Sequence, residues 1–110
     1  MIEIRYKTDM VKHGRKFELD IVGHANYADK GKDIVCAGVS ALTIALMHSL
    51  NDMQKKKKVD NKMIIVYERT HIESLSKIYS DIIEVEATYN TVMKGFEHIA
   101  NEYPNNVKIV

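Results

Sequence analysis

A histidine, an aspartate and a cysteine lie close together in the sequence, at positions 24, 33 and 36. A thiol and an imidazole together can carry out acyl transfer. The sulfur attacks a carbonyl carbon, and the imidazole accepts the thiol proton and later protonates the leaving amine. By pattern alone, an inert buried cysteine and a structural histidine are the more common alternatives.

The element that would position Cys36 is a long apolar helix. Asp33 stands immediately before the apolar run that begins at Ile34, which is the pattern of a helix N-cap. The run predicts a helix over about residues 34–53, buried on more than one side, either under a sheet or at a subunit contact. Cys36 would be its third residue, where unpaired N–H groups and the helix dipole favour a thiolate. The dipole contributes only ~0.3–1 kcal/mol, so a cationic partner is needed, and His24 is the nearest candidate.

Asp33 and Ser40 are candidates to support this pair. A carboxylate at Asp33 opposes ionisation of a neighbouring thiol, so it helps only if it caps the helix or orients His24. Ser40 lies one turn beyond Cys36 and could bond to the sulfur or the helix backbone, or simply permit close packing. Free N–H groups around residues 36–38 could hold the oxyanion of a tetrahedral intermediate.

Strands are predicted on both sides of this helix. Residues 2–8 and 16–23 alternate between apolar and polar side chains, and the segment between them contains Gly14, so an antiparallel hairpin is the simplest connection. The polar segment 24–32 predicts an exposed loop. Residues 62–69 and 72–79 predict a second pair of strands.

The remaining residues predict a second helix and a short strand. Apolar residues recur at helical spacing from Ile82 to Tyr103, and Asp81 with Glu84 resembles a capping box. Pro104 ends this helix, and residues 107–110 could add a closing strand. The order ββαββα(β) predicts a two-layer α+β fold, with two helices packed on a largely antiparallel sheet.

Length and composition limit the possible functions. With 110 residues, 45% of them hydrophobic and 28% charged, the chain is expected to form one domain over residues 1–110. The net charge of +1 provides no strong global attraction for nucleic acid, and no direct nucleic-acid binding is expected. The apolar stretch 34–47 falls short of the ~20 residues that a bilayer requires, so no membrane is expected either.

Cys36 is the only cysteine, which excludes an internal disulfide and a cysteine-rich zinc site. Together with the absence of a secretory pattern at the N-terminus, this favours a cytoplasmic location. The other histidines are scattered without metal-ligand spacing, and neither a metal nor a cofactor is expected.

The residues around the cysteine resemble a known family signature. Gly23-His24-Ala25, then Gly31, then the segment from Asp33 to Leu42 strongly resemble the bacterial ribosomal-processing cysteine proteases, the Prp family. That family has a GHA tripeptide, an intervening mobile loop and a D-x-V-C-A-x-x-S segment. Outside residues 23–42 the likeness is one of pattern only.

The resemblance implies a homodimeric endopeptidase with a Cys36/His24 dyad. Its substrate would be the N-terminal extension of ribosomal protein twenty-seven of the large subunit, and the loop 25–32 would be a mobile cover over the bound peptide. Asp33 and Ser40 match positions of the family motif. No third member of a catalytic triad is evident, so what orients His24 is left open.

A non-catalytic function is the alternative hypothesis. In a ribosome-associated or RNA-binding module, Cys36 would be a core residue and the lysine run 55–58 would contact RNA. Four lysines between a helix and a strand are more often a solvated turn, and no aromatic stacking motif accompanies them.

Overall fold

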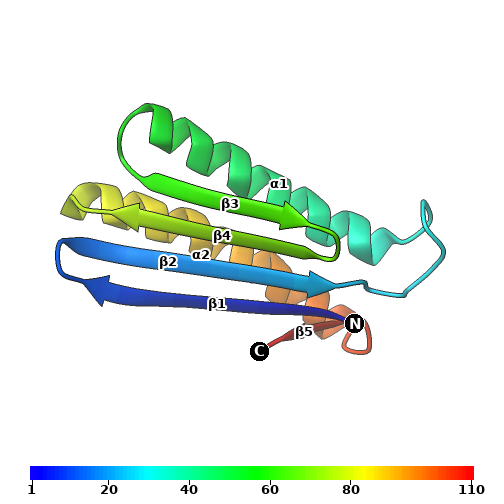
Figure 1. The fold of residues 1–110 in the computed structure, drawn as a ribbon. Coiled ribbons are helices and arrows are strands. Elements are labelled where there is room, and N and C mark those ends of the chain that lie inside the picture. Colours follow the sequence, from blue (N-terminus) through cyan, green and yellow to red (C-terminus); the bar gives the residue numbers. More distant parts are fainter.

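A five-stranded sheet carries both helices on one of its faces in the computed structural model, which describes residues 1–110 (Figure 1). The confirmed order of elements is β1 (Ile2–Val11), β2 (Gly14–Gly23), α1 (Ile34–Lys55), β3 (Asp60–Val66), β4 (Arg69–Ser76), α2 (Tyr79–Glu102) and β5 (Val107–Ile109). The predicted α+β class and the two-layer arrangement are also confirmed.

The strands lie in the order β3-β4-β2-β1-β5, and all neighbours are antiparallel except β1 and β5, which are parallel. The first hairpin closes with Val11 opposite Gly14, so both of its strands are longer than the alternating residues predict. Because β2 pairs with β4, the two hairpins meet along the middle of the sheet.

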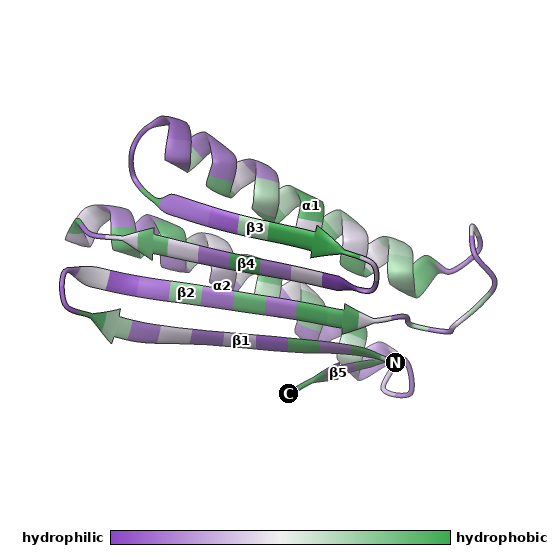
Figure 2. Cartoon of the chain, viewed as in Figure 1, coloured by the Kyte–Doolittle hydropathy of each residue, from purple (hydrophilic) through white to green (hydrophobic).

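The core lies between the sheet and the helices. Alternation along β2 turns Phe17, Leu19 and Ile21 inward, where they are buried against the helices. Figure 2 shows the resulting mixture of apolar and polar positions along the strands. Tyr89 of α2 stacks on Phe17 with ring centroids 5.4 Å apart, and its hydroxyl lies 2.7 Å from the Ser74 hydroxyl. These contacts fix α2 under β2 and β4.

α1 buries one side within the chain, not several as expected from its sequence. Val35, Val39, Leu46 and Leu50 recur at helical spacing and are buried, whereas Ile44 on another side is 52% exposed. The helix is also long and apolar enough, by length and composition alone, to cross a membrane. In this fold its buried side instead packs on the sheet and on α2.

α2 begins three residues earlier than its apolar spacing predicts. Its N-cap is Ile78, which makes no side-chain capping bond, so the capping box expected at Asp81 is wrong. Asp81 lies within the first helical turn instead, where its negative charge favourably faces the helix dipole. The helix ends at Glu102, before Pro104, as predicted.

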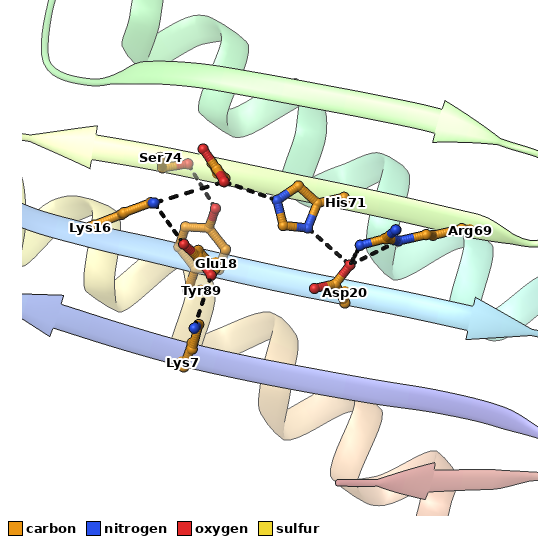
Figure 3. A network of polar contacts seen from close by, with 9 residues as sticks. Lys7, Lys16, Glu18, Asp20, Arg69, His71, Ser74 and Tyr89 are labelled. Carbon is orange, nitrogen blue, oxygen red and sulfur yellow. Dashed lines mark hydrogen bonds and ion pairs between the residues drawn. The ribbon is translucent and has the colours of Figure 1, made fainter.

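Charged side chains cover the sheet face that the helices leave open (Figure 3). Lys16 of β2 bonds to Glu18 at 2.8 Å, and Asp20 bonds to His71 of the neighbouring strand β4 at 2.9 Å. His71 also contacts Glu73 at 3.2 Å. The open face is therefore stabilised by cross-strand ion pairs instead of apolar packing.

Candidate active site

The register between β2 and β4 brings His24 to the turn that joins β3 and β4. Val22 pairs with Arg69, so the residues that follow Val22 continue toward the residues that precede Arg69. The pairing is extended by a hydrogen bond from the Gly23 N–H to the Glu68 carbonyl, at 2.8 Å. His24 therefore leaves the end of β2 beside Tyr67 and Glu68.

The imidazole of His24 contacts both residues of this turn. Its Nε2 lies 2.9 Å from a carboxylate oxygen of Glu68, and the two side chains are 48% and 44% exposed. The Tyr67 ring lies edge-on to the imidazole, with centroids 5.7 Å apart. These contacts occupy one nitrogen of the ring and one of its sides.

Asp33 is the N-cap of α1, as predicted, and its carboxylate accepts four backbone N–H groups. One oxygen accepts from Val35 at 3.0 Å and from Cys36 at 2.9 Å, and the other accepts from Tyr27 at 3.0 Å and Ala28 at 3.4 Å. The hydrogen bond from the Cys36 N–H is the largest of the effects that lower the pKa of Asp33. Asp33 thus caps the helix and makes no hydrogen bond to His24.

The backbone N–H groups expected to hold an oxyanion are already bonded. The Cys36 N–H donates to the Asp33 side chain, and the Ala37 N–H donates to the Asp33 carbonyl at 3.1 Å. Because the N-cap satisfies the first turn so fully, these two donors are not free to receive a substrate oxygen. Of the oxyanion donors expected around residues 36–38, those of Cys36 and Ala37 are therefore already engaged.

Cys36, His24 and Ser40 line one open cleft of about 760 Å³ between the start of α1, the 24–33 loop and the β3–β4 turn. A smaller cavity of about 380 Å³ continues from the same three residues between α1 and the ends of β2 and β3. The structure contains no hydrogen bond between Cys36 and His24. It brings a thiol, an imidazole and a hydroxyl to one solvent-open site, where they can contact a common ligand.

The loop between His24 and Asp33 is anchored at its start and exposed beyond it. Ala25 is 1% exposed, and its carbonyl accepts a hydrogen bond from Asn106 at 2.9 Å. Tyr27 stacks edge-on with Tyr103 at 5.2 Å. Residues 28–32 are exposed, and all of them except Asp29 line the cleft, so this part of the loop can cover a ligand. Mobility of the loop stays a prediction.

Tyr67 and Glu68 were not among the residues that the sequence singled out. The sequence predicts a strand over residues 62–69, whereas β3 ends at Val66 and β4 begins at Arg69. Glu68 adopts a φ of 63°, a left-handed turn conformation that an unbroken strand does not contain. Neither residue is a strong turn former, so only the pairing of β2 with β4 reveals their place beside His24.

The lysine run 55–58 lies at the end of α1, as a turn back toward β3. Lys58 pairs with Glu84 of α2 at 2.7 Å. At least one of these lysines therefore has a partner within the chain, which favours the structural interpretation of the run over an RNA contact.

The chain is similar in sequence to known cysteine proteases. The family model described as "Cysteine protease Prp" matches residues 1–108. The ribosomal processing cysteine protease Prp of Mycoplasma genitalium is 30% identical over 88 residues, which cover 79% of this chain and 80% of that protein.

Two crystal structures of the ribosomal processing protease Prp from S. aureus have the same fold. The complex with a covalently linked product peptide gives a TM-score of 0.72 at 22% identity, covering 99% of this chain and 97% of that one. The complex with a substrate peptide gives a TM-score of 0.66 at 21% identity, covering 100% of this chain and 98% of that one.

The sequence match over nearly the whole chain defines a protein of the cysteine-type peptidase class. The chain belongs to the Prp family of ribosomal processing cysteine proteases, as the residues around Cys36 indicated.

Proposed function

We propose that the chain is an endopeptidase in which Cys36 is the nucleophile and His24 is the general acid and base. The observation that carries this proposal is that a member of a cysteine protease family has only one cysteine, and that this cysteine shares a cleft with a histidine. No other residue of the chain offers a thiol. The class of enzyme therefore supports Cys36 as the nucleophile.

The reaction has two stages that use the same two side chains. The thiol proton passes to the imidazole, and the thiolate forms a bond to the scissile carbonyl carbon, which moves an electron pair onto the carbonyl oxygen. When the tetrahedral intermediate collapses, the C–N bond breaks and the imidazolium protonates the leaving amine. Water then attacks the thioester carbon and gives one proton to the imidazole. The C–S bond breaks, the imidazolium returns its proton to the sulfur, and the new carboxylic acid loses its remaining proton to solvent.

Asp33 and Ser40 support this reaction in different ways. Asp33 fixes the first turn of α1 and ties residues 27 and 28 to it, so it positions the thiol and the adjoining loop together. Its charge is shared among four N–H donors, which reduces its opposition to a neighbouring thiolate. The Ser40 hydroxyl, one turn along the helix, is exposed in the cleft and available to bond to the sulfur or the substrate backbone.

We infer that the substrate is the N-terminal extension of ribosomal protein twenty-seven of the large subunit. The name of the Mycoplasma relative supports a ribosomal substrate, and the S. aureus structures show that this fold binds peptides in a related protein. The cleft and its continuation are large enough for several side chains of an extended peptide.

We also propose that the protein is a cytoplasmic homodimer that works without a metal or cofactor. The exposed apolar residues of α1 and β3, including Ile44 and Ile65, are the surfaces that support a second subunit. A cytoplasmic location agrees with the proposed substrate, because ribosomal proteins are made in that compartment.

Incubation with the precursor protein, read by mass spectrometry, tests the proposed function. The wild-type chain should release a short N-terminal peptide, and Cys36→Ala should abolish release with an unchanged circular dichroism spectrum. Ser80→Ala, an exposed serine at the start of α2 outside the cleft, is the matched control and should cleave normally. Undiminished cleavage by Cys36→Ala would exclude the thiol as nucleophile.

A further inference from the structure

The dyad as proposed lacks a group that orients its imidazole. A solvent-exposed imidazole just after the end of a strand can adopt several rotamers, and only some of them direct a nitrogen toward the thiol. Asp33, the acidic residue that precedes Cys36 at the start of α1, is fully occupied by backbone N–H groups. The orienting group has to come from another part of the fold.

The β3–β4 turn is the part of the fold that can provide it. Val66 pairs with Arg69, which leaves Tyr67 and Glu68 as a two-residue turn. The hydrogen bond from the Gly23 N–H to the Glu68 carbonyl holds this turn against the end of β2, one residue before His24. The turn therefore has a fixed place relative to the imidazole, which a longer loop would not have.

The side chain of Glu68 makes the contact that an orienting residue requires. Its carboxylate lies 2.9 Å from Nε2 of His24, while the Tyr67 ring packs against the imidazole from the side. Nδ1 of His24 has no hydrogen bond in the structure. The carboxylate thus selects the tautomer with the proton on Nε2, and Nδ1 is left to exchange a proton with Cys36.

Neighbouring cations do not neutralise Glu68. Arg69, the next residue, donates to Asp20 on the open face of the sheet at 3.0 Å. The other charged or titratable groups around His24 are the Met1 amine, which donates to the His24 carbonyl, and the cleft-lining side chains of Lys30, Lys32, Asp33, Cys36 and Tyr67. None of these groups forms an ion pair with the imidazole, whose only ion-pair partner is Glu68.

We propose that Glu68 is a positioning residue that orients His24 and stabilises its imidazolium, completing a Cys36–His24–Glu68 arrangement. The inference rests on the proposed function, since it assigns Glu68 a role only through His24. When the thiol ionises, its proton moves to Nδ1, the Nε2 proton stays in the hydrogen bond to Glu68, and the carboxylate remains ionised. The resulting imidazolium is flanked by the thiolate and by Glu68, which favours the ion pair over the neutral thiol and imidazole.

The size of the effect follows from the exposure of the pair. Removing a buried triad carboxylate costs ~10⁴-fold in kcat, but an ion pair that is nearly half exposed is weakened by solvent. We expect Glu68→Gln to lower kcat by about tenfold, with a smaller change in KM, because the proposed role of the carboxylate is to stabilise the imidazolium that forms during the reaction. The glutamine amide can still accept a hydrogen bond from Nε2, so the fold should be preserved.

The test compares Glu68→Gln, Glu68→Ala and Glu68→Asp with Glu84→Gln. Glu84 is the matched control because it is also 44% exposed and forms a single ion pair, with Lys58, away from the cleft. Two quantities are measured: kcat and KM on the precursor protein, and the rate of Cys36 alkylation by iodoacetamide between pH 5 and 9. Glu68→Gln and Glu68→Ala should slow alkylation at pH 6 at least threefold, Glu68→Asp should restore part of the rate, and Glu84→Gln should match the wild type.

The outcomes separate this inference from the proposed function. A wild-type alkylation profile and a wild-type kcat in Glu68→Gln, with Cys36→Ala inactive, would overturn the role of Glu68 and leave the dyad intact. Cleavage by Cys36→Ala would overturn the dyad itself. A loss of alkylation in Glu68→Gln equal to that in Glu84→Gln would show a general charge effect and would also overturn the positioning role.

Discussion

Two histidines of this fold are paired with carboxylates, one on the open face of the sheet and one in the candidate active site, and the two pairs differ in the ring nitrogens that they leave free. His71 lies on the open face of the sheet between Asp20 at 2.9 Å and Glu73 at 3.2 Å, so both of its nitrogens are bonded (Figure 3). His24 lies at the end of β2 and has one carboxylate partner, Glu68. The side chain of His71 is 17% exposed and that of His24 is 48% exposed.

This difference decides which ring can exchange a proton with a ligand. Burial alone would lower the pKa of His71, but hydrogen bonds and charge from Glu73 and Asp20 outweigh burial and raise the pKa above its ordinary value. A ring with both nitrogens bonded stabilises the sheet and has no position left for a substrate. His24 keeps Nδ1 unbonded beside an open cleft, which is what proton transfer needs.

The strongest test of the comparison replaces each histidine by asparagine. His24→Asn should lower kcat/KM on the precursor by about 10²–10⁴-fold, the usual contribution of a general acid and base. His71→Asn should leave kcat/KM within about threefold and lower only the stability, because it removes a cross-strand ion pair. Steady-state cleavage assays and thermal unfolding of both variants measure these effects. Equal losses of activity in the two variants would contradict the distinction.

A smaller effect is expected from moving His24 without removing it. Gly23 has a φ of +103°, and an added Cβ would overlap the Met1 carbonyl oxygen. Gly23→Ala should therefore shift the end of β2, reduce cleavage by about tenfold and lower the stability by more than ~1 kcal/mol, while His71 keeps its partners.

Gly31→Ala is the matched control, because Gly31 also has a positive φ, +87°, but faces open space. It carries the conformational cost alone, about 1 kcal/mol. Calorimetric melting temperatures should rank wild type first, Gly31→Ala second and Gly23→Ala last, and cleavage is compared between wild type and Gly23→Ala alone because Gly31 lines the cleft. The reverse order of the two variants would show that the approach to Met1 does not fix His24.

The smallest effect concerns the pH dependence of stability. Because the folded pKa of His71 is raised, its stabilising contribution is complete below the unfolded value of about 6.5 and is lost as the pH rises through the folded pKa. The free energy of unfolding of the wild type should fall by at most about 1 kcal/mol from pH 6 toward pH 9 on this account. His71→Gln should flatten this fall in urea titrations at several pH values.

His13→Gln provides the reference for that series, since His13 is an exposed turn residue without an ion pair. The free energy of unfolding of His13→Gln should vary with pH as that of the wild type does. A pH dependence that survives unchanged in His71→Gln would assign it to other groups.

Local patterns predicted the elements that carry the residues of the candidate site. The apolar run after Asp33 predicted both the N-cap and the place of Cys36 as the third helical residue, because capping depends on near neighbours in the chain. Alternation predicted the strands and the order of the fold for the same reason. The parallel pairing of β5 with β1 joins distant segments, and no local pattern indicates it.

Contacts between distant segments were beyond the reach of these patterns. Glu68 meets His24 only because β2 and β4 pair in one particular register, and nothing in the sequence near either residue specifies that register. The expected oxyanion donor at Cys36 is taken by the Asp33 side chain, and the one at Ala37 is taken by the first main-chain hydrogen bond of the helix.

The pairing between β2 and β4 also governs when the cleft can exist during folding. A nascent chain that has made only the first hairpin and α1 already contains the sulfur and the imidazole, yet the carboxylate that accompanies the imidazole is still unpaired in a later segment. Closing the middle of the sheet is the event that unites them. The proposed Cys36–His24–Glu68 arrangement is therefore a property of the completed sheet, and a mutation that delays this closure should delay the appearance of full activity without changing any residue of the cleft.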